Sequence, residues 1–324
     1  MMKVGIVGAG MVGATAGFAL VMHGIADDVV LVDINEKRAG AQAEDLFDAT
    51  PFGESVRVYA GDYGALRGAE VVLLCCGAVQ RPGGETRLQL AGRNAKIFRD
   101  FVPQVVSATE GAVLLVAANP VDVLTDVTAS ISNLPRGRVF GSGTTLDTAR
   151  FRTVLSGHLG ISPDSVFAYA LGEHGDSEVL AWSSATVAGV ALAAVADSLR
   201  RPITDGLRTR VDERVRRAAY RIIDGKGTTN FGTGATLGRL VQAIRDDERA
   251  VFTVSAPGTT ETPFGGACFS LPRVLGCGGV LATFNPALSA AEEAAMEHSA
   301  GVVRNATAMS SGPDSDLALS ATGA

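Results

Sequence analysis

Apolar and polar positions follow one another in two distinct periods along the first 140 residues. Short, mostly apolar runs predict strands, whereas apolar residues spaced three and four positions apart predict helices. The predicted strands cover 3–8, 29–33, 56–60, 70–76, 112–117 and 138–140, and the predicted helices cover 11–23, 36–48, 88–108 and 121–131. Because strands and helices take turns, we expect a parallel sheet with helices on both faces. This is a doubly wound α/β domain over residues 1–141.

The pattern changes after residue 141, where the helices become longer and the strands follow one another directly. Helices are predicted at about 144–158, 204–224, 229–246 and 289–307, and an apolar run at 166–171 predicts a strand. Three further strand-like runs, at 250–256, 267–275 and 278–284, predict an antiparallel sheet. We therefore expect an α+β domain over 142–309. Residues 310–324 are small, polar and without periodicity, and we expect a disordered tail there.

The composition is that of a globular protein, since 47% of the 324 residues are apolar and 19% are charged. This length is typical of two domains. A net charge of −6 without a long basic run disfavours nucleic acids and acidic membranes as partners. The chain starts without a signal-peptide pattern and has no apolar stretch of membrane-spanning length.

The four cysteines indicate reduced thiols rather than disulfides or a metal site. Cys75 and Cys76 are neighbours in a predicted strand, where consecutive side chains point to opposite faces. Cys268 and Cys277 are isolated, and none of the four has metal-ligand spacing. We therefore expect no metal and a cytoplasmic location.

A glycine-rich segment, Gly8-Ala9-Gly10-Met11-Val12-Gly13, follows the first predicted strand and opens the first predicted helix. Asp33 ends the second strand, twenty residues after Gly13. This context predicts a dinucleotide site, with the pyrophosphate at the helix N-terminus and the carboxylate on the adenosine ribose hydroxyls. Asp33 would repel a 2′-phosphate, which favours NAD over NADP, although Lys37 and Arg38 lie nearby.

One of only four histidines lies in the segment Gly172–Ser177, directly after the run 166–171. Glycines on both sides of Glu173-His174 give the backbone freedom to present the imidazole at an open strand end. Histidine titrates near neutral pH, so it is suited to proton transfer. We therefore regard His174 as the candidate acid/base.

Hydride transfer to a 2-keto acid needs four groups. It needs a proton donor, a carboxylate to stabilise the charged imidazole, a cation to polarise the carbonyl, and an arginine to hold the substrate carboxylate in a two-point contact. The sequence offers His174, Asp147, Arg87 and Arg150 for these roles, in that order. Asp147 and Arg150 are three residues apart and thus share one side of a helix.

At this point the chain resembles the L-lactate/malate dehydrogenase family, and within it the bacterial L-lactate dehydrogenases. The resemblance runs from Met2 to about Ala306. The matching segments are Gly8 to Gly13 with Asp33, Gln80 to Arg87, Asn119 to Asp122, Gly141 to Thr144, Asp147 to Arg152, Gly172 to Ser177, Lys226 to Thr229, and Ser270 to Pro272.

The resemblance implies a Rossmann-type NAD domain and assigns roles to residues of this chain. It makes His174 the acid/base and Asp147 its partner. It makes Arg150 the clamp of the substrate carboxylate, and Arg87 the group that polarises the carbonyl once the loop 77–87 closes. Asn119 would contact the substrate or the nicotinamide, before a cis bond to Pro120. Gly77 and Ala78 would belong to the cofactor site, and Thr229 would line the substrate pocket. A homotetramer is also implied.

Departures from the family pattern bear on substrate choice and on regulation. The loop carries a doubled glycine, Gly83-Gly84, so the residue that selects the substrate is either Gln80, which would suit pyruvate, or Arg81, which would suit oxaloacetate. We favour Gln80. Many bacterial relatives are activated by fructose 1,6-bisphosphate through an arginine, matched here by Arg152, and a histidine, whose place is taken by Phe167. We therefore expect weak or no activation.

Three hypotheses follow. The first is an L-lactate dehydrogenase that transfers hydride reversibly between NADH and pyruvate to yield L-lactate and NAD+. The second is a malate dehydrogenase or a broad 2-keto acid reductase. The third, from another class, is an NAD-binding protein that has lost catalytic power through its altered loop.

Overall fold

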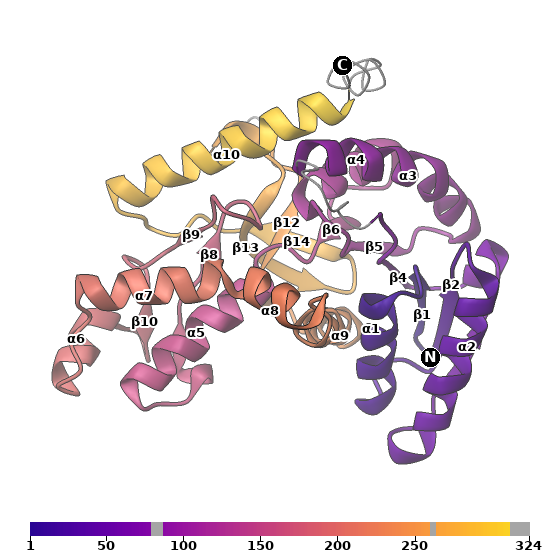
Figure 1. Cartoon of the computed structure of the whole chain (residues 1–324), viewed down its shortest axis with the longest axis horizontal. Helices are drawn as coiled ribbons and strands as arrows, with labels where there is room; N and C mark the ends of the chain where they lie inside the picture. The colour runs from indigo at the N-terminus through magenta and orange to yellow at the C-terminus, as the bar shows by residue number, and fades with distance from the viewer. Residues whose placement is uncertain (79–86, 260–263, 312–324) are drawn as a thin grey trace.

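The computed structural model describes residues 1–78, 87–259 and 264–311, apart from the side chains of residues 87, 88 and 311. In the first half of the chain these residues form six parallel strands in the spatial order β3-β2-β1-β4-β5-β6, and helices cover both faces of the sheet (Figure 1). The strands are β1 (Lys3–Val7), β2 (Asp28–Val32), β3 (Arg57–Ala60), β4 (Val71–Leu74), β5 (Val113–Val116) and β6 (Val139–Gly141). The helices are α1 (Met11–Met22), α2 (Glu36–Ala49), α3 (Arg87–Ala108) and α4 (Val121–Ser132). This order confirms the doubly wound prediction.

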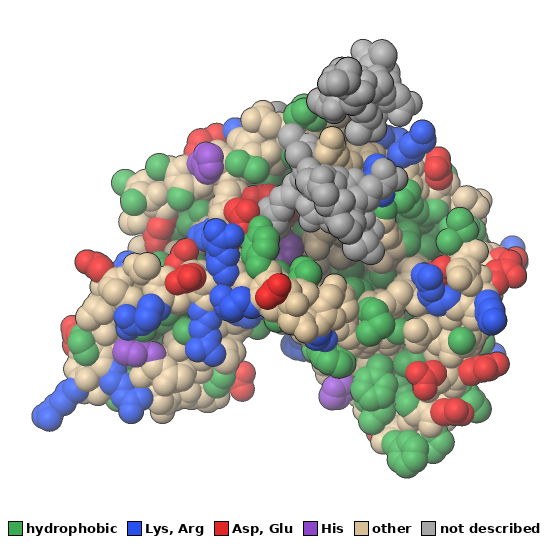
Figure 2. Space-filling model, in the orientation of Figure 1, with side chains coloured by type: hydrophobic (Ala, Val, Ile, Leu, Met, Phe, Trp, Pro, Cys, Tyr) green, Lys and Arg blue, Asp and Glu red, His purple; other side chains and the backbone are tan. Residues whose placement is uncertain are grey.

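Within the described residues, the second half of the chain adds further strands and six helices to this framework (Figure 1). Its helices are α5 (Thr145–Leu159), α6 (Leu192–Ser198), α7 (Asp205–Arg216), α8 (Ala218–Lys226), α9 (Phe231–Arg245) and α10 (Ala290–Ser311). Its strands are β7 (Val166–Phe167), β8 (Ala170–Leu171), β9 (Val179–Leu180), β10 (Thr186–Val187), β11 (Val190–Ala191), β12 (Ala250–Ala256), β13 (Phe269–Gly276) and β14 (Gly279–Thr283). Short 3-10 helices lie at Thr50–Phe52, Tyr63–Leu66, Pro163–Ser165 and Phe264–Gly266. Figure 2 shows lysine and arginine side chains gathered over α5 and α7.

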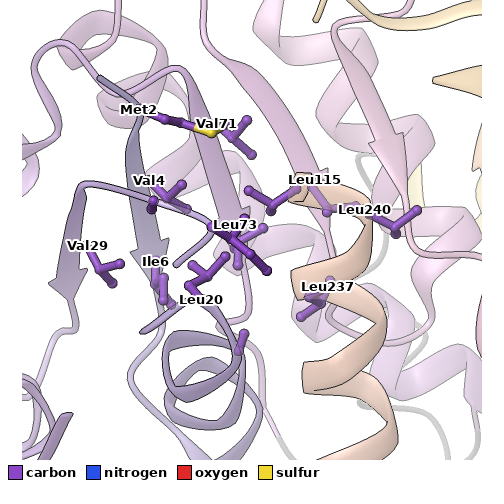
Figure 3. Packing of buried hydrophobic residues seen from close by; sticks show 14 of the residues in the cluster. Met2, Val4, Ile6, Leu20, Val29, Val71, Leu73, Leu115, Leu237 and Leu240 are labelled. Carbon is purple, nitrogen blue, oxygen red and sulfur yellow. The ribbon is translucent and has the colours of Figure 1, made fainter. Parts of the chain in front are cut away.

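The central strands are apolar throughout because both faces of the sheet are covered. Alternate residues of β4 and β5 point to opposite faces. Leu73 and Leu115 belong to the core beneath α1, α2 and α9, whereas Leu74 and Leu114 belong to the core beneath α3 and α4. Figure 3 shows the first of these cores.

Helix α9 connects the two halves of the chain. Its apolar residues Leu237 and Leu240 lie in the same core as the strands of the first half (Figure 3). A Cβ atom on Gly234 would lie 2.6 Å from the Thr15 side chain, so glycine allows α9 to pack closely on α1. Asn230 Nδ2 also donates a hydrogen bond to Thr15 Oγ1 at 2.9 Å.

The antiparallel strands join the parallel sheet rather than forming a sheet of their own. Strand β12 pairs with β6 in antiparallel orientation through Ser255 and Gly141, and β13 and β14 continue from β12. The result is one nine-stranded sheet with a parallel and an antiparallel part. The predicted pairing within 250–284 is confirmed, and its attachment to the first half is what the sequence pattern did not indicate.

Three predicted elements differ from those in the structure. The run 166–171 forms two short strands in separate sheets, since β7 pairs with β10 and β8 pairs with β9. The predicted helix 204–224 is divided at Arg217, whose backbone leaves the helical conformation, into α7 and α8; α7 buries an apolar stripe whereas most apolar residues of α8 are exposed. Helix α10 continues to Ser311, and the Ser310 carbonyl accepts a hydrogen bond from Arg99 Nη2 at 2.6 Å. Residues 310 and 311 are therefore helical rather than part of a tail. The rest of the predicted tail, 312–324, lies outside the described residues.

None of the helices within the described ranges has an apolar stretch long enough to cross a membrane.

Candidate active site

The glycine-rich turn lies at the carboxyl end of β1, and the surroundings that a side chain would meet differ at each of its three glycines. Gly8 has a φ of +102°, and a Cβ atom there would lie 2.5 Å from the backbone nitrogen of Cys76. A Cβ atom on Gly13 would lie 2.0 Å from the Gly8 carbonyl oxygen. Gly10, in contrast, has no atom within 4 Å of a Cβ position. Gly8 and Gly13 therefore make the turn tight, and Gly10 faces open space at the start of α1.

The start of α1 is suited to an anion. Gly10 caps the helix without a side-chain hydrogen bond, and the first turn, which contains Met11 and Val12, has no acidic residue. Its backbone N–H groups and the positive end of the helix dipole are therefore available to a phosphate. Asp33 Oδ2 accepts a hydrogen bond from the Ala9 N–H at 2.8 Å, and this holds the carboxylate beside the turn. These residues fit the pyrophosphate and the ribose of NAD.

Asn94 joins the loops that follow β4 and β5, and the sequence analysis missed it. Its Oδ1 atom accepts a hydrogen bond from the Ala78 N–H at 2.7 Å, and its Nδ2 atom donates to the Asn119 carbonyl oxygen at 2.7 Å. The peptide bond from Asn119 to Pro120 is cis, as the resemblance implied. A signal was present in the sequence, because Asn94 lies four residues from Leu90 and from Phe98 on the buried stripe of α3.

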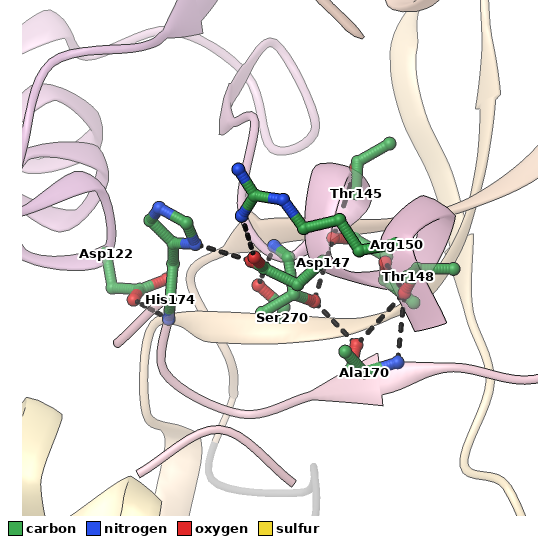
Figure 4. Close-up of polar contacts among 10 residues, drawn as sticks. Asp122, Thr145, Asp147, Thr148, Arg150, Ala170, His174 and Ser270 are labelled. Atoms are coloured by element: carbon green, nitrogen blue, oxygen red, sulfur yellow. Dashed lines mark hydrogen bonds and ion pairs between the residues drawn. The ribbon is translucent and has the colours of Figure 1, made fainter. Parts of the chain in front are cut away.

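His174 is hydrogen-bonded to Asp147, although 27 residues separate them along the chain. The distance from His174 Nδ1 to Asp147 Oδ2 is 2.6 Å, and Arg150 Nη1 donates to the other carboxylate oxygen at 2.8 Å (Figure 4). The Asp147 carboxylate is buried, whereas 27% of the His174 side chain is exposed. Among the described residues, His174 Nε2 has no hydrogen-bond partner, so this nitrogen can face a substrate.

The backbone around this cluster is held from several sides. Thr144 Oγ1, at the start of α5, donates to the Ala170 carbonyl at 2.6 Å. Thr148 Oγ1 accepts from the Ala170 N–H at 2.9 Å (Figure 4). Gly172 and Ser270 exchange two backbone hydrogen bonds of 2.9 Å. These contacts hold α5 against the strand that leads into the histidine segment.

Asp122 at the start of α4 holds the histidine backbone. Its Oδ2 atom accepts a hydrogen bond from the His174 N–H at 2.8 Å (Figure 4). Burial raises the pKa of Asp122 to about 6, against the opposing effect of its hydrogen bonds. The segment Asn119 to Asp122 therefore contacts both Asn94 on α3 and the histidine segment.

The charges in the site favour a protonated histidine. Burial lowers the pKa of His174, but the charge and the hydrogen bond of Asp147 outweigh burial and raise the pKa to about 9. Burial acts to raise the pKa of Asp147, and the positive charges of His174 and Arg150 lower it overall. The buried Glu178 carboxyl lies in the same electrostatic environment, where burial and then the charge of Asp147 raise its pKa to about 8.

Four predicted residues are not placed in this cluster. Gln80 and Arg81 lie outside the described residues, as does most of the predicted lid. Arg87 is the first residue of α3, and its backbone lies seven residues, or about two turns, before Asn94 on the same side of the helix. Thr229 is half-buried just before α9, and its role in a substrate pocket stays a prediction.

Arg152 occupies a different environment on α5. Its Nε donates a hydrogen bond to the Ala168 carbonyl at 2.9 Å, and its guanidinium lies over the Tyr169 ring at 5.0 Å. Phe167, in the position of the activator histidine, is 47% exposed.

Comparison with known proteins identifies both halves of the chain. The family model for the lactate/malate dehydrogenase NAD binding domain matches residues 2–141, and the model for the alpha/beta C-terminal domain of the same family matches residues 144–310. The L-lactate dehydrogenase of Thermus aquaticus is 54% identical over 305 residues, which are 94% of this chain and 98% of the relative. The L-lactate dehydrogenase of Deinococcus radiodurans is 50% identical over 303 residues, which are 94% of this chain and 97% of the relative. The crystal structure of a minor L-lactate dehydrogenase from Enterococcus mundtii superposes with a TM-score of 0.90 at 38% sequence identity. The matched region is 95% of this chain and 98% of the Enterococcus chain.

Proposed function

Because the chain belongs to the lactate/malate dehydrogenase family, we propose that it is an NAD-dependent L-lactate dehydrogenase that interconverts pyruvate and L-lactate. The observation that carries this proposal is the hydrogen bond between His174 Nδ1 and Asp147, beside Arg150 and with Nε2 unpartnered in the described part of the chain.

When bound, NADH supplies the hydride for the reaction. The residues of the chain supply the proton and hold the substrate. His174 Nε2 donates a proton to the oxygen of the reacting carbonyl, and the Asp147 carboxylate stabilises the imidazolium before transfer. The Arg150 guanidinium uses one nitrogen on Asp147 and has others with which to hold the substrate carboxylate.

Three roles belong to the proposal on the strength of the family pattern alone. Arg87 polarises the carbonyl, Gln80 rather than Arg81 lies against the methyl group of pyruvate, and Thr229 lines the pocket. The cofactor contacts Asp33, the turn from Gly8 to Gly13, and the loop ends at Ala78 and Asn119. Residues 1–141 would thus hold NAD and supply Arg87 and Gln80 to the substrate, and residues from 142 on would supply His174, Asp147, Arg150 and Thr229.

The test is NADH oxidation with pyruvate and with oxaloacetate, followed at pH 7 on the purified protein. We expect a higher kcat/KM for pyruvate. A higher kcat/KM for oxaloacetate would identify the malate-specific alternative, and turnover of neither substrate, with NADH still bound, would support the NAD-binding protein. His174→Asn serves as the control, since it removes the proton donor and should abolish turnover without loss of NADH binding.

We further propose that the protein is a homo-oligomer, with the tetramer of the family as the expected state. Arg210 and Arg214 line a groove between α5 and α7, and the outer face of α2 exposes Glu44, Phe47 and Asp48. The two arginines are opposite in charge to the carboxylates of α2, and we propose that each copy places α2 on the groove of the other. Sedimentation velocity should report a species larger than the monomer, and a monomer at all concentrations would contradict this.

Activation by fructose 1,6-bisphosphate should be weak or absent. Arg152 is already engaged with Ala168 and Tyr169, burial lowers its pKa, and Phe167 offers no group to a phosphate. Addition of the bisphosphate to the pyruvate assay should therefore leave the KM for pyruvate unchanged, and a large decrease in that KM at low bisphosphate concentration would contradict this.

As a cellular location we propose the cytoplasm.

A further inference from the structure

Asn94 is a buried polar residue for which the proposed reaction has so far had no use. It lies on α3 with 1% of its surface exposed, among the apolar residues that face the sheet. An amide in such a position is costly unless its hydrogen-bonding groups are satisfied. Here both ends of the amide are used, since Oδ1 accepts from the Ala78 N–H and Nδ2 donates to the Asn119 carbonyl, each at 2.7 Å.

The two loops that Asn94 joins begin at the carboxyl ends of neighbouring strands. Ala78 follows β4 and Asn119 follows β5, and β4 lies beside β1 with its glycine-rich turn. In a doubly wound sheet the ligand occupies the crevice where the strand order reverses, which here lies between β1 and β4. The glycine-rich turn and Asp33 would hold the adenosine end, so the loops after β4 and β5 border the reactive end of the cofactor.

The loop after β5 also reaches the catalytic histidine. Three residues after Asn119, the Asp122 carboxylate accepts the His174 N–H at 2.8 Å. A bonded path therefore runs from Asn94 through the segment 119–122 to the backbone of His174. A Cβ atom on Gly77 would lie 3.4 Å from Asn94 Nδ2 and 3.4 Å from the Ala118 Cβ, so the start of the loop after β4 runs directly beside Asn94 and the loop after β5.

We propose that Asn94 is a positioning residue that holds the loops after β4 and β5 in alignment with His174, so that the nicotinamide end of the cofactor meets the proton donor. The proposal rests on the proposed function. Asn94 acts through Ala78, Asn119 and Asp122, and it leaves the adenosine end of the site unaffected. Its loss should therefore affect hydride transfer and the binding of the whole cofactor, but not the binding of the adenosine half.

The decisive variant is Asn94→Ala, with ADP-ribose and NADH as two separate probes. We expect the Kd for ADP-ribose to stay within about twofold of the wild type, because Asp33 and the glycine turn are unchanged. We expect the Kd for NADH to rise and the kcat for pyruvate to fall on the order of 100-fold, since a displacement of about 1 Å at a reacting centre has an effect of this size. Equal weakening of both ligands, or an unchanged kcat, would overturn the proposal.

The matched control is Thr109→Val, just beyond the far end of α3. Thr109 is also buried, and its Oγ1 donates to the Val105 carbonyl at 2.8 Å. This variant loses a buried hydrogen bond near the start of β5, at the opposite end of the strands from the site. We expect it to lower the melting temperature and to leave the ratio of the NADH and ADP-ribose Kd values unchanged. A change in that ratio would show that general loss of stability, rather than loop position, controls the site.

A second variant, Asn94→Asp, tests the role even if the alanine variant does not fold. Its carboxylate can still accept from the Ala78 N–H, but it faces the Asn119 carbonyl with an acceptor instead of a donor. Protonation restores a donor, and burial raises the pKa of an aspartate. The kcat of this variant relative to the wild type should therefore increase by up to about tenfold per pH unit as the pH falls from 8 toward 6. A ratio that does not depend on pH would contradict the role. Wild-type turnover of pyruvate, measured alongside, reports on the proposed function separately.

Discussion

Asp147→Asn isolates the effect of a single charge on the candidate proton donor. In the wild type the pKa of His174 is raised to about 9 from an ordinary value of 6.5, by the charge and the hydrogen bond of Asp147 acting against burial. An asparagine keeps the shape and the burial but removes the charge. The pKa of His174 should then return to 6.5 or below. The change of about 2.5 pKa units corresponds to about 3 kcal/mol in favour of the neutral imidazole.

The assay is the pH profile of kcat/KM for pyruvate reduction, which reports the pKa of the proton donor before pyruvate binds. For the wild type we expect activity to fall as the pH rises through about 9, since the histidine must be protonated to donate. For Asp147→Asn this fall should begin at or below about 6.5. At pH 7.5 only about a tenth of the imidazole would then be protonated, so kcat/KM should decrease by at least about tenfold.

Asp246→Asn is the matched control, because Asp246 also accepts a hydrogen bond from an arginine, Arg245 Nε at 2.7 Å, but lies on the surface at the end of α9. Its pH profile should coincide with that of the wild type. The reasoning would be refuted if the alkaline limb of Asp147→Asn stayed near pH 9, because another group would then control the histidine.

The remaining predictions concern the clamp, the glycine turn and a buried acid. Arg150→Lys should raise the KM for pyruvate by about 10- to 100-fold in steady-state assays, because a lysine cannot make a two-point contact with a carboxylate. Gly10→Ala should fold normally and lose affinity for NADH, whereas Gly13→Ala should lower the melting temperature strongly, since its Cβ would lie 2.0 Å from a backbone oxygen. The pKa of Glu178 is raised to about 8 by burial, so the folded state retains a proton that the unfolded state releases near pH 4.5, and stability falls as the pH rises from about 4.5 to 8. Urea unfolding of Glu178→Gln should show a smaller loss of stability than the wild type between pH 5.5 and 8.5, and an equal loss would contradict this.

Much of the dinucleotide half could be predicted because its signals are local. The turn from Gly8 to Gly13 is defined by the left-handed backbone of Gly8 and by the close approach of Gly13 to the Gly8 carbonyl, and Asp33 directly follows the strand that pairs with β1. Asp147 and Arg150 lie on one helix, so their spacing alone placed them together. The predicted boundaries of the central strands differ from the structure by one or two residues, since apolar runs do not mark where pairing ends.

Contacts between distant segments could not be predicted with the same certainty. Asn94 lies within a helix, where its polarity is the only sign of its role, and its partners are backbone groups of two separate loops. The attachment of β12 to β6 rests on a single pair of residues. The burial of Glu178 depends on the helices packed over the histidine segment. The residue type at position 178 alone does not indicate that packing.

The sequence by itself determined the α/β framework, the position of the cofactor turn and the residue types that the chemistry needs. These follow from periodicity and from backbone geometry over short distances. Only the tertiary structure decided that His174 lies 2.6 Å from Asp147 with its Nε2 unpartnered among the described residues, and that Asn94 and Asp122 link the cofactor loops to it. The physical reason is that a pKa or a hydrogen bond depends on which groups packing brings within about 3 Å, and packing joins residues that are far apart along the chain.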